Sequence, residues 1–419
     1  METKYLIIGN SAGGIGAAEA IRQVGDTGPI TIVSDEPYPA YSRPLISKYL
    51  SGEYTLDMML LRPADFYNRQ NITTLLGTGV KSLDVEQRRV TLDNGEQITW
   101  EKLLLAPGGR PIVPGIKGVE NGGVFTFTTL DDAKAIDSFL ENAGSAVVIG
   151  GGFIGFSVTE ALLKRGVAVT VVEMEDRTLK AILDEQASHI AEEALEKAGV
   201  TIVTGHMAVE IGGEGTVRDV ALDDGTRVPC DLVVLAIGVS PRTELARDAG
   251  IKIGRGIIVD RQMATSSPDV YACGDAAESY DFVSGTDRLL PIWPTASLGG
   301  RVAGLNMAGQ RTEYPGWTSM NAINYFGLDI VAAGIVDPPE GGDFEVISRE
   351  KGNLYQKVVL KDDLLVGLVF ASDIEKSGIL FGLMRDRVNV ANFKEALLTD
   401  SFGLAYLPKE LWQQKLAPQ

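Results

Sequence analysis

The sequence predicts an α/β fold in which one strand–turn–helix unit occurs twice, followed by a smaller α+β domain at the C-terminus. The apolar run Leu6–Ile8 leads into the glycine turn Gly9–Gly14, and the apolar run Val147–Ile149 leads into Gly150–Gly155. Each turn is followed by residues of helical composition. A buried strand, a tight glycine turn and a helix N-terminus together form a cradle for pyrophosphate. The two units are therefore predicted to be Rossmann-like dinucleotide-binding domains.

The second turn has the full set of glycines, Gly150, Gly152 and Gly155, with Ile154 in the opening helical turn. Glu173 ends the next apolar run, 23 positions after Gly150. This spacing is near the ~20 residues expected for an acid that binds an adenosine ribose. The alternative is a solvated acid at a strand end. A ribose-binding Glu173 would favour NADH, because the 2′-phosphate of NADPH would be repelled. The complication is Arg177, since an arginine nearby can accept that phosphate.

The first turn is less regular, because Ser11 stands between Gly9 and Gly14 where the middle glycine is expected. Ser34 occupies the usual position of the acid, and Asp35 and Glu36 follow it. We expect one of these two acids to bind a ribose. The alternative is a surface turn leading into the next proline.

A longer repeat supports duplication of a whole domain. Residues 90–111 and 220–241 align without a gap over 22 positions. Each copy contains an Asp-Asn-Gly or Asp-Asp-Gly turn between two strand-like runs and ends in a second apolar run. Two dinucleotide sites in one chain imply that electrons pass between the two ligands.

Composition restricts the class of protein. The chain has 419 residues, enough for about three domains. Its net charge of −18 argues against nucleic acid and anionic membranes as partners. The sequence has no signal-peptide layout and no apolar stretch near the ~18 residues of a membrane span, so we expect a soluble, cytoplasmic protein.

Cys230 and Cys273 are the only cysteines, and His189 and His206 the only histidines. The cysteines lie 43 residues apart and form no C-x-x-C pair. A redox-active dithiol and a zinc or iron–sulfur centre are therefore not expected, and we predict no metal site.

Four further motifs resemble those of the two-dinucleotide-binding flavoproteins, also called the FAD/NAD(P)-dependent pyridine nucleotide oxidoreductases. The motifs are Tyr41–Lys48, Ala106–Pro111, Val270–Ala277 and Trp293–Gly304. Within that family the chain is most similar to the NADH:rubredoxin and ferredoxin reductases and to the flavin part of NADH-nitrite reductase. The resemblance implies FAD at the first turn and NAD(H) at the second.

The resemblance also implies roles for individual residues. Asp275 would hold the ribityl chain of FAD, Arg43 and Lys48 would supply positive charge, and the helix after Trp293 would face the flavin ring. The predicted cofactor-binding residues are Gly9, Ser11, Gly14, Asp35, Glu36, Arg43, Lys48, Val80, Ala106, Gly108, Arg110, Gly274, Asp275, Trp293, Thr295, Ala296, Gly150, Gly152, Ile154, Gly155, Glu173 and Gly238.

The chain also departs from the family pattern. Many relatives carry a glutamate two positions after the last glycine of the second turn, where this chain has Ser157. Glu160, one helical turn further on, is the candidate substitute, and Lys48 and Glu160 are the predicted catalytic residues. No cysteine lies between Ser42 and Ile46, which disfavours coenzyme A disulfide reductase and water-forming oxidase activities.

Three domains are expected. A discontinuous FAD domain covers residues 1–112 and 242–311, an NAD domain covers 113–241, and a C-terminal interface or dimerisation domain covers 312–419. In the last domain the sequence predicts a hairpin over Gln356–Phe370 and helical segments at Ile379–Arg385 and Phe393–Leu398.

These features predict an FAD-dependent NAD(P)H oxidoreductase. It would pass electrons between NADH and a one-electron iron–sulfur or rubredoxin-like carrier protein, or serve as the flavin subunit of a larger iron–sulfur enzyme. The alternatives are an NADH oxidase that makes hydrogen peroxide and a redox-sensing FAD/NAD-binding protein. Homodimer formation and membership of a larger complex both stay open.

Overall fold

The computed structural model describes residues 1–403 and 406–407. The chain forms two compact units that each combine distant segments. The first comprises Met1–Pro114, Phe125–Glu141 and Ile237–Trp317, and the second comprises Gly115–Val124, Asn142–Ala236 and Thr318–Gln419. The three-domain division remains a prediction. None of the helices in the described part of the chain is long and apolar enough to cross a membrane.

The first unit contains a parallel sheet in the order β3-β2-β1-β6, with β18 paired to the C-terminal half of β6. This is the strand order of a Rossmann-like sheet. The strands are β1 (Glu2–Ile8), β2 (Ile30–Ser34), β3 (Ile72–Leu76), β6 (Gln97–Leu105) and β18 (Val270–Ala272). Leu6, Ile7, Ile32 and Leu104 are fully buried in it. Buried apolar runs of this kind are typical of a parallel sheet that is covered on both faces.

Shorter strands complete the first unit. Strands β4 and β5 form an antiparallel extension of β6, as the Asp-Asn-Gly turn predicts. The shorter strands of the first unit are β4 (Val80–Asp84), β5 (Arg89–Leu92), β7 (Gly109–Pro111), β16 (Val239–Pro241), β17 (Ile257–Ile258), β19 (Ala277–Asp281) and β20 (Thr286–Leu289). Strand β8 (Val124–Thr126) contains a boundary between the units, since Val124 belongs to the second unit and Phe125 to the first.

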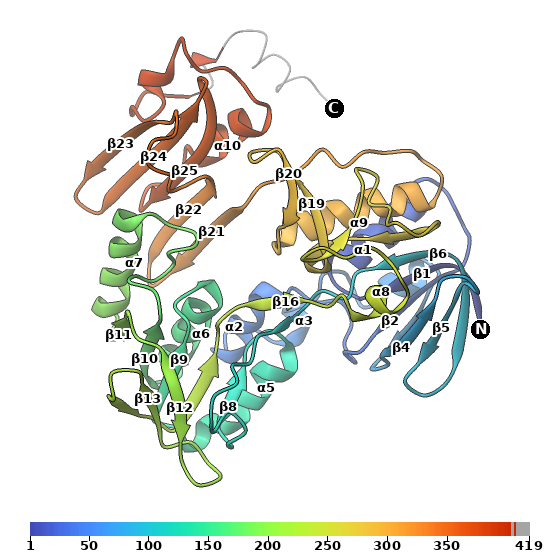
Figure 1. Ribbon diagram of the computed structural model, residues 1–419, viewed down its shortest axis with the longest axis horizontal. Helices are drawn as coiled ribbons and strands as arrows, with labels where there is room; N and C mark the ends of the chain where they lie inside the picture. Colours follow the sequence, from blue (N-terminus) through green and yellow to red (C-terminus); the bar gives the residue numbers. More distant parts are fainter. Residues whose placement is uncertain (404–405, 408–419) are drawn as a thin grey trace. The chain divides into compact units, whose positions relative to one another are not determined.

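Helices α1 and α9 lie side by side over the first sheet (Figure 1). Their contact is made by glycines. A Cβ atom on Gly300 would lie 2.0 Å from the carbonyl oxygen of Gly13, and one on Gly304 would lie 2.4 Å from that of Ala17. The helices of this unit are α1 (Ala12–Gln23), α2 (Ile46–Leu50), α3 (Leu56–Met59), α4 (Phe66–Arg69), α5 (Leu130–Phe139), α8 (Glu244–Asp248) and α9 (Trp293–Met307).

The second unit repeats the parallel order with β11, β10, β9 and β15. The segment that matches β6 is interrupted here, since Pro229 ends one strand and Leu232 starts the next. Between them Asp231 accepts hydrogen bonds from the backbone amides of Gly144 and Ser145, both at 3.0 Å. The elements are β9 (Ser145–Ile149), α6 (Phe153–Lys164), β10 (Ala168–Glu173), α7 (Glu185–Lys197), β11 (Thr201–Thr204), β12 (Ala208–Gly212), β13 (Asp219–Leu222), β14 (Arg227–Pro229) and β15 (Leu232–Leu235).

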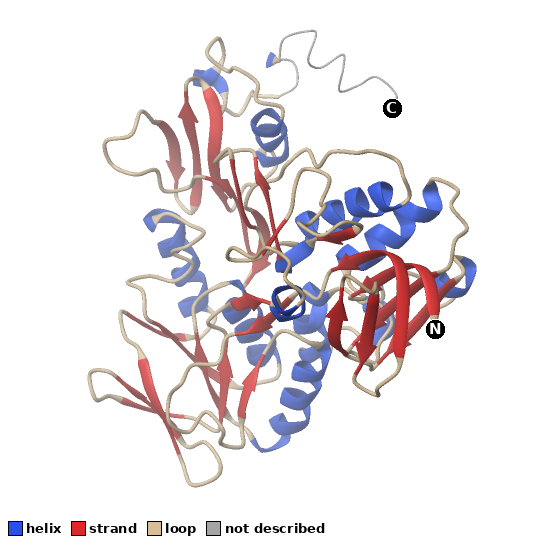
Figure 2. Ribbon diagram, turned by 45° about the vertical axis from the view of Figure 1, so that its right-hand side comes forward, coloured by secondary structure: helices blue, strands red, loops and turns tan. Residues whose placement is uncertain are grey.

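An antiparallel sheet with the order β21-β22-β25-β24-β23 follows in the same unit, and Figure 2 shows its strands with the short helix α10. The predicted hairpin is β24 and β25, and the predicted helix at Ile379–Arg385 lies within α10. The prediction at Phe393–Leu398 was wrong in extent, because only a 3-10 turn forms at Lys394–Ala396. The elements are β21 (Met320–Tyr325), β22 (Leu328–Gly334), β23 (Glu345–Lys351), β24 (Leu354–Lys361), β25 (Leu364–Ala371) and α10 (Ser377–Arg385). The predicted α/β fold with an α+β C-terminal part is confirmed.

Candidate functional site

The two glycine turns share one backbone pattern. In each, the first glycine donates a hydrogen bond to the second strand, and the return strand donates one to the end of the first strand. The nitrogen–oxygen distance is 2.8 Å in all four cases. The pairs are Gly9–Val33 and Ala106–Ile8 in the first unit and Gly150–Val172 and Ala236–Ile149 in the second. This correspondence shows that the sequence repeat reflects one folded plan used twice.

The outer glycines are required by close packing of the backbone. A Cβ atom on Gly14 would lie 2.0 Å from the carbonyl oxygen of Gly9, and one on Gly155 would lie 2.0 Å from that of Gly150. Gly152 differs, because nothing lies within 4 Å of its Cβ position. The middle position of the second turn therefore faces open space in which a phosphate group fits.

Helices α1 and α6 both start without a side-chain cap. Ser11 and Gly152 hold the N-cap positions, and neither makes a capping hydrogen bond. The first amide N–H groups of each helix therefore lack the partner that a cap would supply, and they lie at the positive end of the helix dipole. Both turns fit the pyrophosphate of a dinucleotide.

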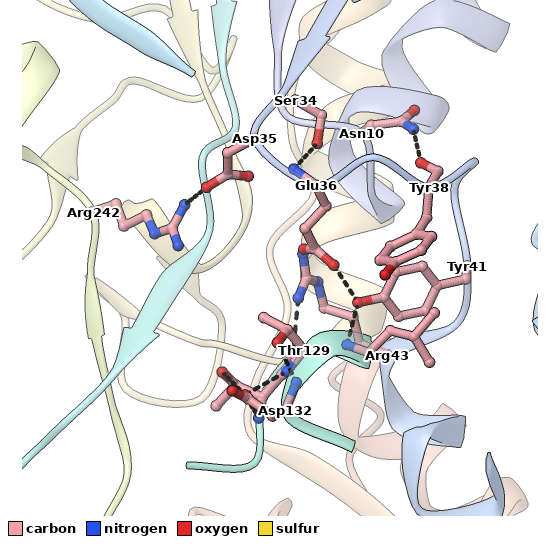
Figure 3. A network of polar contacts seen from close by, with 12 residues as sticks. Asn10, Ser34, Asp35, Glu36, Tyr38, Tyr41, Arg43, Thr129, Asp132 and Arg242 are labelled. Carbon is pink, nitrogen blue, oxygen red and sulfur yellow. Dashed lines mark hydrogen bonds and ion pairs between the residues drawn. The ribbon is translucent and has the colours of Figure 1, made fainter. Parts of the chain in front are cut away.

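A small open pocket lies beside the first turn, on the side of β2. Its lining residues are Asn10, Ser11, Ser34, Glu36, Tyr38, Pro39, Tyr41 and Arg43. Of the two predicted ribose acids, Glu36 lines this pocket. Asp35 is paired with the Arg242 guanidinium at 2.6 Å instead (Figure 3).

Glu36 is the centre of a polar network (Figure 3). Its carboxylate forms an ion pair with Arg43 and accepts a hydrogen bond from the Tyr41 hydroxyl at 2.5 Å. The Tyr41 oxygen in turn accepts from the backbone amide of Leu130 at 2.9 Å, and Arg43 donates to the carbonyl of Thr128 at 3.1 Å. The start of α5 thus holds the Arg43 loop in place.

Burial affects the ionisation of this network. Burial raises the pKa of Tyr41, so its hydroxyl keeps its proton at neutral pH. Burial lowers the pKa of Arg43, but Tyr41 and Glu36 outweigh burial and raise it. The positive charge of Arg43 lowers the pKa of Asp275, but burial has the larger effect and raises it. A half-buried carboxyl beside an arginine is suited to hydroxyl groups of a ligand.

The structure brings Gly274 and Asp275 next to the start of α9. A Cβ atom on Gly274 would lie 3.4 Å from the Cβ of Ala296. Trp293 opens the helix after an N-cap, Ile292, that makes no side-chain cap, so amide N–H groups are available there too. Thr295, in the first turn of this helix, is buried.

Other residues predicted for the first site do not line the pocket. Lys48 lies in α2 and is paired with Glu53 at 3.2 Å, and Arg110 forms an ion pair with Glu244. Val80 begins β4 and packs against the hydrophobic core. The turn residues Gly108 and Gly238 both have positive φ, +74° and +109°.

In the second unit, Glu173 lies against the glycine turn. Its carboxylate accepts hydrogen bonds from the amide of Gly151 at 2.7 Å and from that of Glu175 at 2.9 Å. The backbone oxygen of Gly151 accepts from Leu179 at 3.0 Å. Glu173 is thus fixed beside the turn, as a ribose-binding acid requires.

The predicted catalytic residue Glu160 lies on α6. Its carboxylate accepts a hydrogen bond from the amide of Phe326 at 3.2 Å and lies 3.7 Å from the Lys164 ammonium. It therefore fastens the turn between β21 and β22 to the helix. A role for Lys48 and Glu160 in hydride transfer stays a prediction.

Both cysteines are buried and unpaired. Burial raises the pKa of each thiol to about 12, so neither is a thiolate at neutral pH. Cys273 packs against the first glycine turn, where a Cβ atom on Gly13 would lie 2.8 Å from its Sγ. His206 lies near Asp223 and Asp224 at the surface, where its ring pairs with both carboxylates.

Sequence reasoning missed part of the first pocket. Asn10 accepts a hydrogen bond from the Tyr67 hydroxyl at 2.9 Å and donates to the carbonyl of Tyr38 at 3.3 Å. The contacts from Thr128 and Leu130 were missed as well. Neither group of contacts can be recognised from a local sequence pattern, because both join segments that are distant in sequence.

Comparison with known proteins agrees with this geometry. Residues 3–300 match the family described as pyridine nucleotide-disulphide oxidoreductase. The chain belongs to this family. It is therefore an NAD(P)H-dependent flavoprotein oxidoreductase. Residues 320–388 match the rubredoxin NAD+ reductase C-terminal domain, which places the chain near the rubredoxin and ferredoxin reductases.

Individual relatives extend the similarity over more than nine tenths of the chain. The chain is 31% identical over 407 residues to the NADH-dependent phenylglyoxylate dehydrogenase subunit epsilon of Aromatoleum evansii, and the match covers 96% of both. It is 31% identical to the assimilatory nitrate reductase electron transfer subunit of Bacillus subtilis, covering 92% of this chain but 49% of that longer protein. Putidaredoxin reductase, crystallised in a covalent complex with putidaredoxin, matches with a TM-score of 0.85 and 27% identity, covering 92% and 94% of the two chains.

Proposed function

We propose that the protein transfers electrons between NADH, bound at the second glycine turn, and a one-electron carrier protein, through FAD bound at the first. The observation that carries this proposal is the pair of matching turns, each with an uncapped helix N-terminus and a close acid. When bound, FAD would accept two electrons as a hydride and release them one at a time.

The first turn is assigned to FAD because more groups converge on it. Ser11 and the α1 amides would bind the pyrophosphate, Glu36 the adenosine ribose, and Asp275 the ribityl hydroxyls. Arg43 supplies positive charge beside the same pocket. The N-terminus of α9 would lie at the flavin ring and favour negative charge there.

The second turn is assigned to NADH. The α6 amides and Gly152 would bind its pyrophosphate, and Glu173 would accept hydrogen bonds from the adenosine ribose. This arrangement needs no thiol. The high pKa of both buried cysteines supports a reaction without a disulfide intermediate.

The carrier is inferred from chemistry and from relatives. Without a redox-active dithiol, electrons must leave through the flavin itself. The named relatives include an electron transfer subunit, a subunit of a dehydrogenase and a reductase in covalent complex with putidaredoxin. An iron–sulfur or rubredoxin-like protein, separate or within a larger enzyme, is the partner we propose. Because this chain has a net charge of −18, it does not attract an acidic carrier over a long range, and such a carrier has to dock through local contacts.

The test is anaerobic stopped-flow reduction. Purified protein loaded with FAD is mixed with NADH under nitrogen, and then with ferredoxin or rubredoxin. We expect the visible flavin absorbance to fall on NADH addition and the carrier to be reduced rapidly. Failure of NADH to bleach the flavin would reject the proposal. NADH consumption only in air, with stoichiometric peroxide and no carrier reduced, would favour an oxidase instead.

A further inference from the structure

Arg177 lies at the edge of the proposed ribose site for NADH. The next residues, Thr178 and Leu179, pack directly on the glycine turn. A Cβ atom on Gly151 would lie 3.2 Å both from the Glu173 carboxylate and from the Thr178 Cβ. The 2′-position of a ribose bound to Glu173 therefore falls near the Arg177 segment.

The Arg177 guanidinium is incompletely satisfied. Its side chain is 16% exposed, and its Nε atom is buried without a hydrogen-bond partner. Its two terminal nitrogens make long contacts, 3.4 Å to Asp176 and 3.3 Å to Asp337. A guanidinium has five N–H donors in a fork that suits phosphate. Arg177 thus has the donors to bind an anion at this position.

The second of these contacts comes from a distant segment. Asp337 follows β22 in the C-terminal part of the chain, 160 positions after Arg177. That part is attached to the NAD-binding part by a buried cluster in which Asp184 accepts hydrogen bonds from the Tyr355 hydroxyl at 2.6 Å and the Lys357 ammonium at 2.7 Å. The attachment keeps the Asp337 loop beside Arg177.

We propose that Asp337 pairs with Arg177 and so keeps its guanidinium from binding a 2′-phosphate. The C-terminal part of the chain would then help to determine the preference for NADH over NADPH. The inference rests on the proposed function, because it concerns the same NADH site. Asp176 and Asp337 contact the guanidinium, and Glu173 lies with the adjoining Thr178 against Gly151, so the local charge is negative and repels a 2′-phosphate. Removal of the Asp337 charge would free donors of Arg177 and weaken that repulsion.

The experiment measures dissociation constants of NAD+ and NADP+ by calorimetry on the FAD-loaded full chain. Asp337→Asn should tighten NADP+ about fivefold and change NAD+ less than about twofold, since an exposed ion pair is worth up to ~1 kcal/mol. Asp337 is exposed, so the variant should fold normally. Asp343→Asn, which removes a charge from the same loop, is the matched control and should change neither constant.

A double variant identifies the group responsible. In Asp337→Asn combined with Arg177→Gln, the gain in NADP+ affinity should disappear. Equal shifts for NAD+ and NADP+, no shift, or a gain that persists without Arg177 would overturn the inference while leaving NADH binding intact. A wild-type protein that binds neither nucleotide would overturn the proposed function as well.

Discussion

Helices α1 and α6 both begin at a glycine turn, yet they pack against different kinds of neighbour. Helix α1 contacts α9 backbone to backbone, through Gly13 against Gly300 and Ala17 against Gly304. Helix α6 carries Phe156, whose ring centre lies 6.3 Å from those of both Tyr325 and Phe326. In the first unit the helix at the glycine turn thus packs on another helix, whereas in the second unit it packs on residues of the C-terminal sheet and its first turn.

The acids that follow the two turns also have different partners. Glu36 is neutralised by Arg43 and held by Tyr41, whereas Glu173 bonds the backbone of its own turn. The two turns share one backbone structure, so the surrounding side chains must determine which ligand each turn binds. The following predictions test this division, from the largest expected effect to the smallest.

Attachment of the C-terminal sheet should depend on the buried charge of Asp184. In Asp184→Asn the cap acceptor remains, but Lys357, 8% exposed, loses its counterion. We expect a loss of about 3–5 kcal/mol in the free energy of unfolding, measured with urea. The exposed pair Glu345–Lys394 is the control, and Glu345→Gln should cost below ~1 kcal/mol. Equal costs would contradict the importance of this cluster.

The first unit should instead depend on the small-residue contact of α9. Gly300→Ala places a Cβ atom 2.0 Å from the carbonyl oxygen of Gly13, so the helices must separate. We expect a loss of about 3 kcal/mol and a lower FAD content. Gly378→Ala, in α10 with nothing within 4 Å, should stabilise by about 0.5–1 kcal/mol. If both variants have the same stability, the close helix contact is not important.

Gly152 should matter more for ligand binding than for folding. Its Cβ position is open, and its φ of −85° suits any residue. Gly152→Val should therefore cost at most about 1 kcal/mol in the free energy of unfolding, because valine is a poor N-cap for α6. It should weaken NADH binding at least about tenfold, by filling the space proposed for pyrophosphate. Fluorescence titration with NADH measures this. Unchanged affinity would show that the nucleotide binds elsewhere.

The two thiols should be inert in the folded protein. Burial raises both pKa values to about 12, so the reactive thiolate forms only at strongly alkaline pH, or once unfolding restores an ordinary pKa. Iodoacetamide at pH 8 should label neither Cys230 nor Cys273 until urea is added, as read by mass spectrometry. Rapid labelling of the native protein would reveal an accessible thiol.

Local patterns were sufficient to predict much of this structure. Both strand–turn–helix units, the repeat over 90–111 and 220–241 and the β24–β25 hairpin follow from residue order alone. The interruption after Pro229 was not predicted, because Asp231 is held by backbone amides of Gly144 and Ser145 far away in sequence. The 3-10 turn at Lys394–Ala396 was mistaken for a longer helix.

Side-chain partners at the candidate sites were less predictable. Arg242 holding Asp35, Phe326 donating to Glu160 and Asp337 contacting Arg177 all join segments separated by more than 150 positions. None of these pairs has a spacing rule, since each depends on how finished elements pack. The sequence alone left Asp35 and Glu36 equivalent, and the pocket lining together with the ion pair between Asp35 and Arg242 distinguishes them.

The most direct test of the division between the two halves compares Arg43→Gln with Glu173→Gln. FAD content is measured by absorbance and the dissociation constant of NADH by titration. We predict that Arg43→Gln is purified without tightly bound FAD, whereas Glu173→Gln keeps one FAD per chain and binds NADH about tenfold more weakly, as expected for loss of a hydrogen bond to a charged group. Loss of FAD in Glu173→Gln, with full FAD in Arg43→Gln, would contradict the assignment of the two turns.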